Sequence, residues 1–305
     1  MFVYFLKRLV QSIIVLLFVV TATFLLMRIA PGSPFAAERK IPAKVEAALM
    51  KKYNLDGSLV DQYTSYLANL LKGNFGDSLK YEGRTVLEIL AQAFPKSALV
   101  GGFSLVIALL LGIVLGSYAA IHHNELLDRL AMLLALLGIC LPVFVIAPLL
   151  ILIFAMQWNF LPVAGWGNLS HIILPVVCLS LPYGAYCARL MRTSMLDVLG
   201  QDFIRTAHAK GLSAQVVLYK HALRYAILPL VNYTGPLAAH LFTGSMIIEE
   251  IFKVPGMGSF FVNGVLNRDV FLVGGSVIVY CALLLTLNFV VDIINVYLDR
   301  RIQLW

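Results

Sequence analysis

The amino-acid sequence predicts an all-α integral membrane protein with six transmembrane helices and an extracytoplasmic insertion after the first helix. Of its 305 residues, 60% are hydrophobic and only 13% are charged, whereas soluble domains carry about 25% charged residues. Six uncharged runs of 18 to 28 residues divide the chain, and about 20 apolar residues cross a bilayer as one helix. Only helices satisfy their backbone groups in lipid without strand pairing.

The six expected transmembrane helices follow one another along the chain. They are Leu9–Met27, Ala98–Ile121, Leu130–Gln157, His171–Ala188, Tyr225–Ile248 and Val270–Val291. The first run is longer than the roughly 7–15 apolar residues of a signal peptide, and Pro31 directly after Ala30 is a poor setting for cleavage. We therefore expect the first helix to be retained.

Basic residues predict how these helices are oriented. Lys7 and Arg8 precede the first run, Arg300 and Arg301 follow the last, and residues 189–224 hold six Lys or Arg against two acids. Cytoplasmic loops carry such an excess of Lys and Arg. We expect both termini in the cytoplasm and the chain to pass several times through the membrane.

The domain organisation follows from these helices. Residues 1–29 form the N-terminal end and first helix, 30–93 an extracytoplasmic domain, 94–295 a core of five helices with a cytoplasmic loop at 191–226, and 296–305 a cytoplasmic tail. Within the extracytoplasmic domain, apolar spacing predicts one helix in PAKVEAALMKKYNL and a second in LVDQYTSYLANLLKG, the latter stopping at Gly73. So small a domain holds a modest core, and we expect it to lean on the transmembrane helices or on a partner.

Several kinds of chemistry are missing from the sequence. No Gly-Lys dipeptide occurs, so a phosphate-binding P-loop is absent. No zinc-protease or serine-hydrolase motif is present, and the four cysteines lie in apolar runs without metal-binding spacing. The net charge of +7 is typical of cytoplasmic loops and does not indicate nucleic-acid binding. We expect no enzyme activity, metal or cofactor in this chain. A lone carboxylate such as Asp292 predicts a cap or an inter-helix hydrogen bond, because a proton relay needs several such groups.

The loop stretch FIRTAHAKGLSAQ, residues 203–215, predicts two short helices separated by a sharp turn. The first begins near Asp202, whose charge favours a helix N-terminus, and ends at Lys210 with Gly211 beyond it. Ser213 is a suitable N-cap for the second. The physical properties of the loop leave two roles open. It docks on a protein, or it rests as an amphipathic helix on anionic lipid.

A resemblance to a known protein family favours docking of this loop on a protein. RTAHAKGLS followed by KHALRYAILP resembles the EAA loop of ABC importer permeases, in the peptide/nickel subgroup. Arg205 replaces the usual Glu of the general motif, and His208 stands where this subgroup often has Arg or Lys. The likeness covers the full length and is greatest to the B subunit of bacterial oligopeptide permeases. The further motifs are MRIAPGSPF (27–35), GNFGDS (73–78), SMLDVLGQDFIRTA (194–207), GSMIIEEIFKVPGMG (244–258) and VNGVLNRD (262–269).

The resemblance implies the ABC transporter type I permease fold and the import of oligopeptides driven by ATP. Dipeptides, nickel or another small solute of the subgroup remain alternatives, as does a stand-alone channel or facilitator. The implied partners are a second permease, two ATPase subunits that carry ATP and Mg²⁺, a peptide-binding protein outside the cell, and membrane lipid. The implied ATPase-coupling loop comprises Asp202, Phe203, Arg205, Thr206, Ala207, Ala209, Lys210, Gly211 and Leu212.

Polar groups in and after the fifth run are candidates for a translocation path or gate. They are Asn232, Tyr233, Thr243, Ser245, Glu249 and Glu250. A peptide needs hydrogen-bonding groups along its path, but such residues also bond neighbouring helices. Glu249 and Glu250 begin the last outside loop, where they form a gate or part of a platform for the binding protein.

Overall fold

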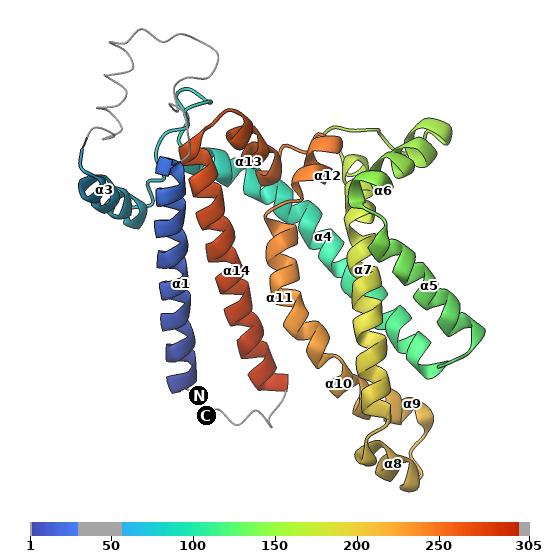
Figure 1. Cartoon of the computed structure of the whole chain (residues 1–305). Helices are drawn as coiled ribbons and strands as arrows, with labels where there is room; N and C mark the ends of the chain where they lie inside the picture. The colour runs from blue at the N-terminus through green and yellow to red at the C-terminus, as the bar shows by residue number, and fades with distance from the viewer. Residues whose placement is uncertain (1, 30–56, 299–305) are drawn as a thin grey trace.

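The computed structural model describes residues 2–29 and 57–298, which are almost entirely helical. Four helices are long and apolar enough to span a membrane (Figure 1). They are α1 (Phe2–Ile29), α4 (Val86–Ile121), α7 (Ser170–Leu199) and α14 (Val270–Leu298). A fifth span requires α5 (Leu126–Cys140) to be counted together with α6 (Val143–Leu150) and the π-helix η1 (Ile151–Gln157).

Shorter helices complete the chain. They are α3 (Leu59–Leu71), α8 (Asp202–Ala209), α9 (Ala214–Val216), the π-helix η2 (Val217–Ala222), α10 (Leu223–Ala226), α11 (Leu228–Phe242), α12 (Met246–Ile251) and α13 (Met257–Leu266). The expected helix at LVDQYTSYLANLLKG is confirmed as α3, which Gly73 follows with a φ of 74°. The other expected helix, PAKVEAALMKKYNL, lies outside the described residues.

The expected bounds of several transmembrane helices are wrong. α7, for example, continues to Leu199, beyond the expected end at Ala188. α4 begins at Val86, well before Ala98, because Thr85 and Glu88 form a capping box there and the helix continues through Lys96. The third expected helix is bent by 103° after Cys140, where Pro142 disfavours a helical conformation of Leu141. The fifth expected helix, Tyr225–Ile248, ends at Phe242.

Glycines let the long helices approach closely. A Cβ on Gly101 of α4 would lie 2.0 Å from the carbonyl oxygen of Leu241 on α11. Lower on α4, a Cβ on Gly116 would lie 2.5 Å from the carbonyl oxygen of Ala188 on α7. Because these neighbouring atoms belong to the backbone, they cannot move aside for a side chain. Only glycine at these two positions lets α7 and α11 lie so close to α4.

Side-chain contacts attach the peripheral elements to the core. Arg8 of α1 and Asp292 of α14 form an ion pair with an N–O distance of 2.5 Å, so the expected inter-helix role of Asp292 is confirmed. α3 rests on α1, where the hydroxyls of Tyr63 and Thr21 lie 2.6 Å apart and the Phe24 ring meets that of Tyr63. The described part of the insertion therefore leans on a transmembrane helix, as expected.

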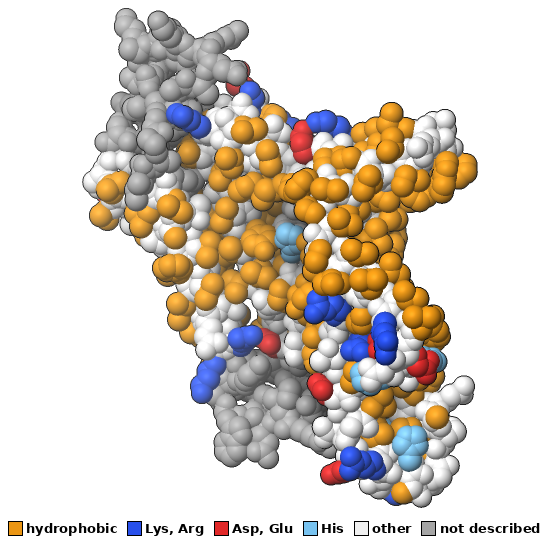
Figure 2. Space-filling view, turned by 45° about the vertical axis from the view of Figure 1, so that its right-hand side comes forward, with side chains coloured by type: hydrophobic (Ala, Val, Ile, Leu, Met, Phe, Trp, Pro, Cys, Tyr) orange, Lys and Arg blue, Asp and Glu red, His pale blue; other side chains and the backbone are white. Residues whose placement is uncertain are grey.

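Charged side chains lie at the two ends of the molecule, and most of them lie at one end. The start of α1, the end of α14 and helices α8 and α9 lie at the same end in Figure 1, which we call the α8 end. In Figure 2 hydrophobic side chains cover most of the middle of the visible face, while Lys, Arg, Asp and Glu lie toward both ends and are more numerous toward the α8 end. This division matches a lipid-facing belt above a water-exposed end.

Candidate functional site

The segment after α7 forms a small projection at the α8 end. α7 ends at Leu199, and α8 begins at Asp202 after the extended residue Gln201. The expected start near Asp202 is confirmed, and its carboxylate lies in the first turn, where the helix dipole favours negative charge. The ion pair between Asp202 and Arg205, at 3.4 Å, is largely exposed and adds little stability.

α8 has one face buried against the rest of the chain and one face exposed. Ile204 and Ala207 are 3% and 6% exposed, and the Phe203 ring packs edge-on against Tyr225 with ring centroids 5.2 Å apart. The other expected coupling residues are exposed: Asp202, Arg205, Thr206, Ala209, Lys210, Gly211 and Leu212. The apolar side of α8 thus anchors the projection, and the surface available to a partner is polar and basic.

The turn after α8 is a Schellman motif. The backbone N–H of Gly211 donates to the carbonyl of His208 at 2.9 Å, and that of Leu212 donates to the carbonyl of Ala207 at 3.4 Å. Gly211 has a φ of 77°, and nothing within 4 Å would meet a Cβ there. Glycine is therefore favoured by the backbone conformation, and the space beside it is open to a partner.

The second expected helix of the loop is divided. Ser213 has the extended backbone of an N-cap, but its side chain makes no capping hydrogen bond. The helix continues as α9, η2 and α10, and the buried residues Val217, Ala222 and Ala226 fix it to the core. π-Helical turns of this kind are frequent at functional sites.

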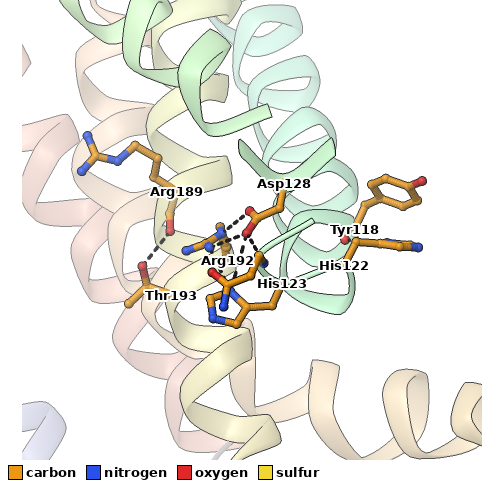
Figure 3. Close-up of polar contacts among 8 residues, drawn as sticks. Tyr118, His122, His123, Asp128, Arg189, Arg192 and Thr193 are labelled. Atoms are coloured by element: carbon orange, nitrogen blue, oxygen red, sulfur yellow. Dashed lines mark hydrogen bonds and ion pairs between the residues drawn. The ribbon is translucent and has the colours of Figure 1, made fainter. Parts of the chain in front are cut away.

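An ion-pair cluster joins α7 to the turn between α4 and α5 (Figure 3). Arg192 Nη2 lies 2.7 Å from Asp128 Oδ2 and 3.1 Å from His123 Nδ1. The backbone N–H of Asn124 donates to the same Asp128 oxygen at 3.0 Å. Asp128 is 2% exposed, so the cluster fixes the helix that leads directly into α8.

The candidate path residues do not form one site. Thr243 and Ser245 line a groove between α7 and α11–α14. The Tyr233 ring packs at a tilt against that of Tyr186 of α7, with ring centroids 4.6 Å apart, and Asn232 is exposed on α11. Glu250 is exposed and pairs with Lys253, as expected for a surface charge.

Glu249 is a buried carboxylate that joins three elements. Ser97 Oγ of α4 donates to its Oε1 at 2.6 Å, and the backbone N–H of Ser259 at the start of α13 donates to its Oε2 at 3.2 Å. Ser97 in turn accepts the backbone N–H of Met257 at 2.8 Å. Burial raises the pKa of Glu249 to about 7, although the hydrogen bond from Ser97 opposes the shift.

Sequence reasoning did not identify several residues of these clusters. Asp128, Arg192, Ser97 and His240 were not singled out, and neither was Asp269, which accepts the backbone N–H groups of Leu79 and Lys80. A histidine inside an apolar run was a usable signal for His240, because ionisable groups in membrane segments mark cavities and pathways. The other partners are far apart in the chain, and no local pattern connects them.

Known proteins resemble this chain over nearly its whole length. Residues 112–304 match the family described as "Binding-protein-dependent transport system inner membrane component", and residues 1–100 match its N-terminal region. The oligopeptide transport system permease protein OppB of Haemophilus influenzae is 45% identical over 97% of this chain and 98% of its own. The dipeptide transport system permease protein DppB of Bacillus subtilis is 42% identical over 99% and 98%.

A solved structure shares the fold at low sequence identity. The crystal structure of an amino acid ABC transporter with histidines superposes with a TM-score of 0.53 and 14% identity, over 69% of this chain and 94% of that one. The family match, which covers more than half of the chain, decides the assignment. This chain belongs to the family of binding-protein-dependent transport system inner membrane components.

Proposed function

We propose that this chain is the permease subunit of an ATP-driven importer that carries oligopeptides across the bacterial cytoplasmic membrane. The observation that best supports this proposal is the 45% identity, over nearly the full length, to an oligopeptide permease. Dipeptides are the second candidate cargo, since a dipeptide permease is 42% identical.

In this proposal the chain crosses the membrane six times, with α10 and α11 together as the fifth span. Both termini and α8 lie in the cytoplasm, and residues 57–85 lie outside. The start of α1, the end of α14 and α8 lie at the same end of the molecule (Figure 1). This arrangement supports the orientation, as do the basic residues there.

The α8 turn would couple transport to ATP hydrolysis on two partner ATPase subunits, which hold ATP and Mg²⁺. The exposed face of α8 and the open space beside Gly211 offer a docking surface. Because α7 continues into this projection and the Asp128–Arg192 pair ties α7 to α5, a push on α8 is delivered to the helices of the core. A second permease completes the path, and an external binding protein delivers the peptide.

The test is co-purification of the tagged chain from its host, in the wild type, Gly211→Asp and Gly167→Asp. Both glycines have positive φ and open space, but Gly167 precedes α7 and lies at its opposite end. We expect the wild type to bring a second permease and the ATPases, Gly211→Asp to lose the ATPases, and Gly167→Asp to retain them.

Two results would contradict the proposal. If the wild type is recovered alone and still moves solute in liposomes, the chain is a facilitator and α8 is a lipid contact. If the complex assembles but neither oligopeptides nor dipeptides are taken up with ATP, the proposed peptide cargo is wrong. Nickel or another solute of the subgroup is then the cargo to test.

A further inference from the structure

A groove of about 490 Å³ opens between α6, α7, α11, α12, α13 and α14. Most of its wall is apolar, including Val143, Ile247, Phe261 and Val277. The remaining wall carries a group of polar side chains. These are Tyr183, His240, Thr243, Ser245, Ser276 and Tyr280.

Five of the polar side chains of the groove fall into two groups. The hydroxyls of Thr243 and Ser276 donate to carbonyl oxygens of their own helices, at 2.8 and 2.7 Å. Among residues 2–29 and 57–298, by contrast, the imidazole of His240 and the phenol hydroxyls of Tyr183 and Tyr280 have no hydrogen-bond partner. The rings of Tyr183 and His240 meet edge to face, with centroids 5.8 Å apart, so these groups share one wall.

Free hydrogen-bonding groups on an otherwise apolar, lipid-depth surface are costly unless a polar partner meets them. Lipid tails offer no such partner. A neighbouring transmembrane helix offers only polar side chains, because its backbone groups bond within the helix. An extended peptide differs from both, since each of its residues brings a free N–H and a free carbonyl.

We propose that this groove is a transient binding site for the backbone of the transported peptide, with His240, Tyr183 and Tyr280 as its hydrogen-bonding groups. The inference rests on the proposed import function and assigns this subunit its own contact with the cargo. Peptide backbone is common to all sequences, and the apolar wall accepts side chains of many shapes without specific bonds. The site therefore suits cargo of varied sequence.

The fold also places this groove beside the buried Glu249. Gly244 and Gly258 line the groove, and a Cβ on either would lie within 3.0 Å of a Glu249 carboxylate oxygen. The Glu249 carboxylate therefore packs behind the groove wall and stabilises it, and it does not contact the cargo.

A photo-crosslinking experiment tests the site directly in the complete transporter. A p-benzoylphenylalanine replaces Phe261, which lines the groove, or Phe144, an exposed residue of the neighbouring α6 that does not. A radiolabelled tripeptide is supplied by the binding protein with ATP. We expect competable labelling at position 261 and none at position 144.

A second experiment removes only hydroxyl groups. Tyr183→Phe and Tyr280→Phe keep the rings and their packing. Tyr186→Phe is the control, because its ring packs against Tyr233 outside the groove. At limiting loaded binding protein, we expect each groove variant to slow uptake about fivefold, the effect of one neutral hydrogen bond. The control variant, Tyr186→Phe, should take up peptide at the wild-type rate.

The outcomes separate this proposal from the function on which it rests. A wild type that takes up no peptide contradicts the proposed function itself. A wild type that transports peptide, while position 261 is never labelled or both Tyr→Phe variants transport at the wild-type rate, overturns the groove as the binding site.

Discussion

Asp128 and Arg192 form a two-pronged ion pair that joins the first turn of α5 to the last third of α7. The Nε–Oδ1 and Nη2–Oδ2 distances are 2.6 and 2.7 Å. Bidentate pairs of this kind are the strongest charge-assisted hydrogen bonds that side chains make. The Asp128 side chain is 3% exposed and that of Arg192 is 20% exposed, so water does little to replace either partner.

Loss of Arg192 should therefore destabilise the protein strongly. Arg192→Gln leaves the Asp128 charge buried without its main partner, at an expected cost of about 3–5 kcal/mol. The thermal unfolding temperature of the purified protein measures the effect. Arg205→Gln breaks an exposed pair and should change that temperature little. The double variant Asp128→Asn/Arg192→Gln should recover part of the loss, and no recovery would show that the charge of Asp128 is not the cause.

Adjacent glycines on α4 should respond differently to the same change. Gly101→Ala places a Cβ 2.0 Å from the Leu241 carbonyl oxygen and separates α4 from α11, which should cost at least the roughly 1–3 kcal/mol of overpacking. At Gly102 the nearest atom, on the Phe242 ring, is 3.6 Å away, so Gly102→Ala should be neutral or slightly stabilising. Equal unfolding temperatures for the two variants would contradict the close approach of these helices.

Glu249 should make stability depend on pH. Its pKa is raised from 4.5 to about 7 in the folded protein, so folding favours the protonated carboxyl. The stability that it contributes is fully present below about pH 4.5 and is lost as the pH rises through about 7. Glu249→Gln removes this titration. We expect the difference in unfolding temperature between pH 5.5 and pH 8 to shrink in the variant, and an unchanged difference would assign the pH dependence to other groups.

Asp269 should hold the turn at residues 78–81 in place. Its buried carboxylate accepts hydrogen bonds from the Ser78 hydroxyl and from the backbone N–H groups of Leu79 and Lys80. Hydrogen bonds to a charged group contribute about 1.5–3 kcal/mol each. Asp269→Ala should therefore speed tryptic cleavage after Lys80 several-fold, while cleavage after Lys72, outside this turn, stays at the wild-type rate. Equal acceleration at both sites would indicate general unfolding.

Local interactions explain what the sequence alone determined. The apolar runs predicted the long helices, because a helix in lipid needs only its own backbone bonds and an apolar surface. The α8 projection was equally predictable. Asp202 in the first turn and the Gly211 turn depend on hydrogen bonds between residues at most five apart. Several motifs that resemble the family occur in the same order along the chain. They indicated the family before any tertiary contact was known.

Long-range contacts determine the features of the fold and site that the sequence did not predict. The partners Asp128 and Arg192, Ser97 and Glu249, and Ser78 and Asp269 are separated by 64, 152 and 191 residues. The bend after Cys140 was also hidden, since apolar residues continue through it. Only the packed helices bring Tyr183, His240 and Tyr280 to one groove. A linear pattern records which groups a segment carries, but the free energy of burying them depends on neighbours that the fold supplies.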